Sequence, residues 1–265
     1  MNPTADATGR TVLVTGSSRG LGRETCHELA RRGFRVIATS RDPDQARGLA
    51  EELTRRGGAA EHHGLDVEDA GSIGALAAVL RGRAVDVLVN NAAIALDGFD
   101  AEVARRTIAV NFTGALAVTD AILPLMPRGA GIVMVSSGVG GLSELGAAAR
   151  ARLADRALTR DALVALMQRF VADVGAGRHR QEGWPSSGYQ VSKAGLNALV
   201  RVLAPELSGR GIHINAVCPG WVRTDMGGSH APRGLAEGAA SIVWAAALTD
   251  DTTGGFFRDG AAIPW

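Results

Sequence analysis

Tyr189 and Lys193 form the residue pair most suggestive of chemistry, because they are the only tyrosine and the only lysine among 265 residues. The chain has 28 basic residues, so arginine fills every other basic position and an ammonium at 193 looks like a specific requirement. Residues four apart share one helix face, and a nearby cation would lower the phenol pKa from its usual value near ~10. The pair therefore suits acid–base chemistry; the alternative is an ordinary pair on an exposed helix.

A glycine-rich turn, residues 15–22, lies between the first apolar run and the first helical stretch. Gly16 suits a tight turn, Gly20 lets a phosphate approach the backbone, and Gly22 permits close packing of helix on strand. The helix that follows offers free N–H groups and a positive dipole to a pyrophosphate. Glycine triplets alone are a weak signal, but the strand–turn–helix context favours a dinucleotide site over a chance loop.

The end of the second expected strand indicates which dinucleotide binds. NAD sites usually place a carboxylate there to bind the ribose hydroxyls, whereas this chain has Ser40 followed by Arg41. Arg41 and Arg19 would suit a 2′-phosphate, so the sequence favours NADP(H). Two alternatives stay open: the arginines are ordinary surface residues, or Asp42 restores a ribose contact after a one-residue shift.

Strand and helix patterns alternate along the chain, which predicts one doubly wound Rossmann-type α/β domain with a parallel sheet. The expected strands are 12–15, 35–39, 59–65, 85–89, 131–136, 213–217 and one near Phe256; the expected helices run to Arg32 and over 45–56, 73–80, 111–123, 159–174 and 189–207. The single domain would span residues 1–265, with a flexible leader over 1–10 and a helical insertion over about 142–184. Within the insertion, Thr159 is a plausible N-cap.

Composition excludes several classes of partner. A net charge of +1 gives no reason to expect nucleic acid binding, and no apolar run approaches the ~20 residues needed to span a membrane. The two cysteines, Cys26 and Cys218, fit a reduced cytoplasmic protein rather than a disulfide framework. The histidines show no metal-ligand spacing, so no metal is expected.

Motifs spread over the whole chain resemble those of the short-chain dehydrogenase/reductase family. They are residues 15–22, Leu65-Asp66-Val67, Asn90-Asn91-Ala92-Ala93, Asn111, Ser136-Ser137, the run from Tyr189 to Lys193, and Pro219-Gly220. The runs 182–189 and 218–226, with the insertion, resemble the monomeric carbonyl reductases in particular, which implies a monomer. The chain departs from the family at Ala93, where glycine is usual, and this adds a methyl group near the cofactor.

The resemblance implies four catalytic residues. Tyr189 would donate the proton, Lys193 would tune it and bind the nicotinamide ribose, and Ser137 would hold the developing alkoxide. Ser136 is the alternative to Ser137. Asn111 would hold a water that links the lysine to solvent, or it would cap the helix that it opens.

The cofactor site implied by these motifs draws on every segment of the domain. Asp66 would contact the adenine or cap a helix from Val67, Asn90 would meet the cofactor, and the Val222 backbone would bind the carboxamide. The full set is Gly16, Ser18, Arg19, Gly20, Leu21, Gly22, Arg41, Asp66, Val67, Asn90, Ala92, Tyr189, Lys193, Pro219, Gly220, Val222 and Thr224.

Four residues are candidates for an apolar substrate pocket: Val139, Trp184, Trp221 and Met226. Aromatic residues make up only 4% of the chain, so a tryptophan in each of two motif loops is notable. The expected function is NADPH-dependent reduction of a ketone, aldehyde or quinone to an alcohol. The alternatives are an NAD-dependent alcohol or steroid dehydrogenase of the same family and a non-catalytic dinucleotide sensor.

Overall fold

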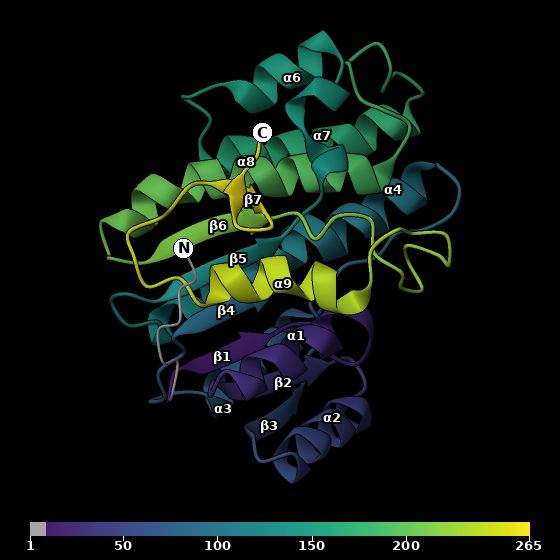
Figure 1. Cartoon of the computed structure of the whole chain (residues 1–265). Helices are drawn as coiled ribbons and strands as arrows, with labels where there is room; N and C mark the ends of the chain where they lie inside the picture. The colour runs from purple at the N-terminus through teal and green to yellow at the C-terminus, as the bar shows by residue number, and fades with distance from the viewer. Residues whose placement is uncertain (1–8) are drawn as a thin grey trace.

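The computed structural model describes residues 9–265, so most of the expected leader lies outside the described residues. An eight-stranded sheet in the order β3-β2-β1-β4-β5-β6-β7-β8 forms the centre (Figure 1). Its strands are β1 (Thr11–Val14), β2 (Arg35–Ser40), β3 (Ala59–Gly64), β4 (Val87–Asn90), β5 (Gly131–Val135), β6 (His213–Val217), β7 (Phe256–Arg258) and β8 (Ala261–Ala262). The α-helices are α1 (Gly20–Arg31), α2 (Pro43–Arg55), α3 (Ala70–Val79), α4 (Ala101–Ile108), α5 (Ala115–Ile122), α6 (Ala147–Ala154), α7 (Arg160–Gly175), α8 (Gly188–Ser208) and α9 (Leu235–Ala246).

Helices cover both faces of the sheet, which confirms the predicted doubly wound α/β fold. One face packs its buried valines, such as Val12 and Val87, against α1, α2 and α9. The alternate residues, such as Leu13 and Leu88, pack with α3, α4, α5 and α8 on the other face. All pairings up to β7 are parallel, and only the short β8 runs antiparallel among the described strands. Strand order reverses between β1 and β4, where doubly wound sheets form their binding crevice.

The helix predicted to open at Asn111 begins ten residues earlier. Asp100 caps α4 by accepting from the Val103 N–H at 2.8 Å, and the helix continues through a π-helical turn, η1 (Ala109–Gly114), into α5. A short 3₁₀ turn, η2 (Leu123–Leu125), ends it at the expected proline, Pro124. Asn111 therefore lies inside the helix, so the cap role considered for it is wrong. The charged residues of α4 face outward, while Ala104, Thr107 and Ile108 are buried at helical spacing.

The same helix corrects the expectation about apolar segments. From Ala101 to Leu125 it is 25 residues long and apolar enough to cross a membrane by length and composition alone. More than half of its apolar window is nevertheless buried inside the domain. Core helices of this kind meet the same criterion, because they too are apolar on most sides.

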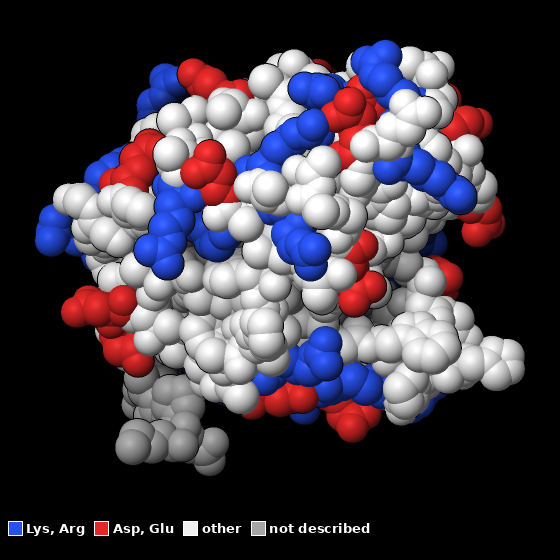
Figure 2. Space-filling view, turned by 90° about the horizontal axis from the view of Figure 1, so that it is seen from above, with Lys and Arg blue, Asp and Glu red and all other residues white. Residues whose placement is uncertain are grey.

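The insertion supplies α6 and α7, which lie beyond α8 at the end of the molecule opposite β3 and α2 (Figure 1). The Thr159 hydroxyl accepts from the Ala162 N–H, so Thr159 caps α7 as its sequence position indicated. Helix α7 buries Leu163, Met167 and Phe170 in the core shared with α8. Acidic and basic side chains are interspersed on the face in Figure 2, in keeping with a net charge of +1.

Candidate active site

The glycine-rich turn joins β1 to α1 and takes the shape that its glycines predict. Gly16 has φ +65° and Gly20 has φ +54°, a region that residues with a side chain rarely adopt. A Cβ on Gly16 would lie 2.9 Å from the Ala92 Cα, and one on Gly22 would collide with the Gly16 carbonyl. These glycines thus leave the start of α1 open to a phosphate, and the turn fits a dinucleotide.

A hydrogen-bonded tie holds this turn against the end of β4. Thr15 Oγ1 accepts from the N–H groups of Asn91 and Ala92, both at 2.9 Å, while Asn91 Nδ2 donates to the carbonyls of Thr15 and Gly16. Asn91 was not among the predicted site residues. Asn90 was, but its side chain donates to Thr119 Oγ1 at 3.0 Å and is turned away from the glycine turn.

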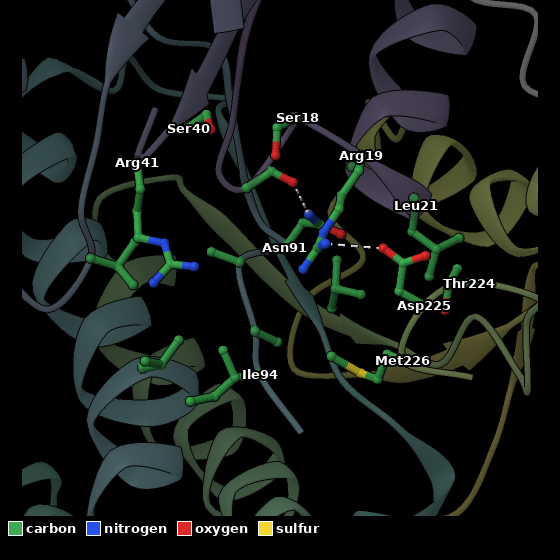
Figure 3. A pocket seen from close by; sticks show the side chains of 18 of the residues that line it. Ser18, Arg19, Leu21, Ser40, Arg41, Asn91, Ile94, Thr224, Asp225 and Met226 are labelled. Carbon is green, nitrogen blue, oxygen red and sulfur yellow. Dashed lines mark hydrogen bonds and ion pairs between the residues drawn. The ribbon is translucent and has the colours of Figure 1, made fainter. Parts of the chain in front are cut away.

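A cleft opens at the carboxyl edge of the sheet beside the turn (Figure 3). Fourteen of the expected cofactor residues line it: Gly16, Ser18, Arg19, Gly20, Leu21, Gly22, Arg41, Asp66, Val67, Ala92, Tyr189, Lys193, Pro219 and Thr224. Asn90, Gly220 and Val222 do not line it; Val222 is 3% exposed and pairs its backbone with Arg233. Ala93, the departure from the family pattern, lies on the cleft wall.

The charged residues at the end of β2 favour a cofactor with a 2′-phosphate, NADP(H), over NAD(H). Ser40 and Arg41 line the cleft at the end of β2, with the Arg41 guanidinium directed into it (Figure 3). Asp42 instead caps α2, accepting from the Asp44 N–H at 3.0 Å and from Gln45 Nε2 at 2.9 Å. Both carboxylate oxygens of Asp42 thus hold the start of α2, and this favours Arg41 over Asp42 as the residue that would face the cofactor.

Arg19 and Asp66 have partners that the sequence did not reveal. Arg19 forms an exposed ion pair with Asp225 at 3.0 Å, which joins the glycine turn to the loop after β6 (Figure 3). Asp66 accepts from the Glu68 N–H at 3.0 Å in a tight turn. The helix that follows starts at Ala70 and is capped by Asp69, so the cap role considered for Asp66 is wrong.

Tyr189 and Lys193 enter the cleft from the first turns of α8, which Ser187 caps through the Gln190 N–H. Lys193 Nζ lies 5.5 Å from the centre of the Tyr189 ring and donates to the Val135 carbonyl at 2.7 Å. Lys193 is 3% exposed, and this burial lowers its pKa to about 8.

The expected lowering of the Tyr189 pKa is contradicted. Burial raises the pKa of Tyr189 to about 12, and its hydrogen bond with Ser137 opposes this rise without overcoming it. Lys193 does not lower the Tyr189 pKa, because its Nζ is directed to the Val135 carbonyl. Burial also lowers the pKa of Lys193 itself. The phenol therefore keeps its proton at neutral pH.

The two neighbouring serines, Ser136 and Ser137, have different surroundings in the structure. Ser136 is 2% exposed and donates to Asn197 Oδ1 at 2.6 Å, on the inner side of α8. Ser137 follows it into the open end of β5 and hydrogen-bonds Tyr189. Ser137 is thus the serine placed to contact a substrate oxygen beside the phenol.

Exchanging each serine for alanine should separate catalysis from stability. In Ser137→Ala, kcat should fall by about 10²-fold or more, because one donor to the developing oxyanion is lost. In Ser136→Ala, the free energy of unfolding should fall by about 1–3 kcal/mol, since Asn197 keeps a buried acceptor without a donor. Steady-state kinetics and urea unfolding check both; equal kinetic losses in the two variants would contradict this assignment.

Asn111 ties two parts of the site together from within η1. Its Oδ1 accepts from the Ile94 N–H at 2.8 Å, and its Nδ2 donates to the Ile94 carbonyl and to Ser192 Oγ. Ser192 in turn donates to the Tyr189 carbonyl at 2.7 Å. Asn111 is 1% exposed, so it fixes the loop after β4 to the start of α8.

The expected substrate-pocket residues divide into two groups. Val139, Trp221 and Met226 are large apolar side chains that remain 47%, 58% and 48% exposed, and Met226 among them lines the cleft. Trp184 is 2% exposed, packs edge-on against Phe170 at 5.5 Å and donates to Asp173, so it belongs to the core of the insertion and not to the pocket. The position of a tryptophan in a loop motif did not indicate whether its side chain would be exposed, as in Trp221, or buried in the core, as in Trp184.

Family models and known proteins match almost the whole chain. The model described as short chain dehydrogenase matches residues 10–169, and that described as Enoyl-(Acyl carrier protein) reductase matches residues 172–251. Carbonyl reductase (NADPH) 1 from Sus scrofa is 38% identical over 276 residues, which cover 97% of this chain and 94% of that protein. The enzyme of the same name from Homo sapiens is 38% identical and covers 91% and 92%.

Solved structures share the fold over a similar extent. Salutaridine reductase from Papaver somniferum superposes with a TM-score of 0.86 at 30% identity, covering 94% of this chain and 99% of that one. An NADPH-bound carbonyl reductase from chicken fatty liver gives 0.75 at 26% identity, covering 99% and 96%.

Proposed function

This chain belongs to the short-chain dehydrogenase family, and we propose that it reduces ketone, aldehyde or quinone carbonyls to alcohols with NADPH. The observation that carries the proposal is the meeting of Tyr189 and Lys193 in a cleft that begins at a dinucleotide-type glycine turn, with Ser137 beside Tyr189. The similarity to NADPH carbonyl reductases supports both the cofactor and the class of substrate.

The protein's residues have separate roles in this reaction. Bound NADPH would supply a hydride to the carbonyl carbon. The Tyr189 hydroxyl donates a proton to the carbonyl oxygen, and the Ser137 hydroxyl hydrogen-bonds the same oxygen as negative charge develops. The Lys193 ammonium, held at the Val135 carbonyl beside the Tyr189 ring, would bind the nicotinamide ribose of the cofactor. Asn111 would bind a water molecule that links Lys193 to solvent and so allows a proton to be replaced.

The ionisation of Tyr189 supports the reductive direction. With its pKa raised to about 12, the phenol is protonated at neutral pH and ready to act as an acid. Oxidation of an alcohol needs the phenolate as base, and burial disfavours that form. Reduction is therefore the proposed direction at neutral pH.

NADPH and NADH oxidation with a panel of aldehydes, ketones and quinones tests the proposal. The wild type should oxidise NADPH much faster than NADH. In Arg41→Ala, kcat/KM for NADPH should fall by about 10-fold or more, because a charge-assisted bond to the 2′-phosphate is lost, while that for NADH should change little. Arg47→Ala, which removes an exposed arginine from α2, is the matched control and should not alter the ratio. No turnover with any carbonyl, despite cofactor binding, would reject the proposal.

We also propose a monomer in a reducing compartment such as the cytoplasm. Helices α6 and α7 lie over α8 and cover this face of it, and α7 is anchored there by Leu163, Met167 and Phe170. Both cysteines are buried and free. Light scattering after size exclusion tests the monomer, and a mass near twice 27.3 kDa would reject it.

A further inference from the structure

Arg258, at the end of β7, is a cation beside the reaction site with most of its hydrogen-bonding capacity unused. A guanidinium has five N–H donors. Within residues 9–265, its one hydrogen bond is from Nη2 to Cys218 Sγ at 3.0 Å, and thiols are weak acceptors. Its Nε is buried and has no partner among these residues. Buried donors of this kind are costly unless something accepts from them.

The acidic residue next to it is already committed. Asp259 forms a two-pronged ion pair with Arg233, at 2.6 and 2.8 Å, and accepts from Ser241 at 3.1 Å. Asp259 is close enough to feel the Arg258 charge, which contributes to lowering its carboxyl pKa, but no ion pair joins the two in the described part of the chain. The Arg258 charge is thus left without a close carboxylate.

Arg258 lies against the loop that carries Ser137. A Cβ added to Gly138 would lie 2.9 Å from Arg258 Nη2, so the guanidinium packs against the residue that follows Ser137. Cys218 Sγ also accepts from the Gly138 N–H at 3.2 Å. Cys218 is the first residue of the loop that carries Trp221 and Met226. Arg258 therefore lies where the loop of Ser137 and Val139 meets the loop of Trp221.

We propose that Arg258 forms an anion subsite that selects carbonyl substrates bearing a carboxylate. The substrate would place its carbonyl at Tyr189 and Ser137, its apolar body against the exposed side chains of Val139, Trp221 and Met226, and its carboxylate on the Arg258 guanidinium. The two oxygens of a carboxylate match the donor geometry of a guanidinium. This rests on the proposed reductase function and specifies its substrate class.

The test compares the ortho, meta and para isomers of carboxybenzaldehyde with their neutral methyl esters. For at least one isomer, the wild type should prefer the acid, measured as the ratio of kcat/KM for acid over ester. Arg258→Met should reduce this ratio by about 10-fold or more, corresponding to about 1.4 kcal/mol, and Arg258→Lys should restore part of it. Arg210→Met, in a remote turn where the arginine bonds the Leu123 carbonyl, is the control that should keep the ratio.

A binding experiment separates this proposal from the reductase function. Calorimetry with the NADP⁺-saturated protein should detect benzoate but not benzamide, and Arg258→Met should lose the benzoate signal. Ester turnover reports the reductase function by itself, so benzoate binding without any turnover would reject that function and keep the subsite. An acid-to-ester ratio that is the same in wild type and Arg258→Met, or equal binding of benzoate by both, would overturn the subsite.

Discussion

Tyr189→Phe should reduce kcat for carbonyl reduction by about 10³-fold while the protein still folds and binds NADPH. The substitution removes one hydroxyl and keeps the ring that Lys193 faces at 5.5 Å. Loss of a positioned general acid typically costs between about 10² and 10⁴ in rate. Ser137 and the bound cofactor would remain to support residual turnover.

The measurement is single-turnover reduction under NADPH saturation, with cofactor binding followed separately by nucleotide fluorescence. The wild type provides a further check, because a phenol with a pKa of about 12 stays protonated across neutral pH. Its reductive rate should accordingly show no loss between pH 6 and 7.5 from titration of this group. Wild-type turnover in Tyr189→Phe would instead favour the dinucleotide-sensor alternative.

Lys193→Met should make the protein more stable and much less active. Burial lowers the lysine pKa from 10.5 to about 8, and at about 1.36 kcal/mol per pKa unit this corresponds to a penalty of about 3 kcal/mol at neutral pH. The variant also leaves the Val135 carbonyl without its donor, which costs about 1–3 kcal/mol. A net gain of up to about 2 kcal/mol is expected, with kcat/KM reduced by about 10²-fold or more.

The pH dependence of this gain identifies its cause. Below pH 8 the amine is charged in both folded and unfolded chains, so the full penalty applies. Between pH 8 and 10.5 the unfolded chain binds more protons than the folded one, so wild-type stability rises with pH and the gap to Lys193→Met closes. Lys193 is the only lysine, and other groups cancel in the difference between the two proteins. Denaturant unfolding at pH 7 and pH 10 measures the difference in free energy of unfolding between the two proteins. A difference that is the same at both pH values would show that burial of the charge is not the cause.

The parts of the site that depend on backbone pattern could be predicted from sequence. Gly16, Gly20 and Gly22 are needed for backbone shape and close packing, so their spacing carries the information directly. The alternation of apolar runs gave the order of strands and helices for the same reason. The pairing of Tyr189 with Lys193 needed only helical spacing.

The parts that depend on side-chain direction could not. Successive residues at a strand end point to opposite sides, so nothing in the pair Asn90-Asn91 told which amide would hold the glycine turn. Asp42 and Asp66 stand before helices whose first residues were uncertain by a few positions, and this margin decides whether a carboxylate caps a helix or faces a ligand. The Tyr189 pKa depends on total burial, which no short motif encodes.

The π-helical turn at Ala109–Gly114 makes the long helix intolerant of length changes. Its first part, α4, packs on α7 and α8, whereas its second part, α5, packs on β4 and α3. A π turn accommodates one more residue than a turn of α-helix. Deleting one residue between 109 and 114 would convert it to a turn of regular helix, shift its buried side chains and pull Asn111 off Ile94 and Ser192. A deletion scan should therefore find this buried turn far less permissive than the surface loops, although most of its individual side chains are ordinary.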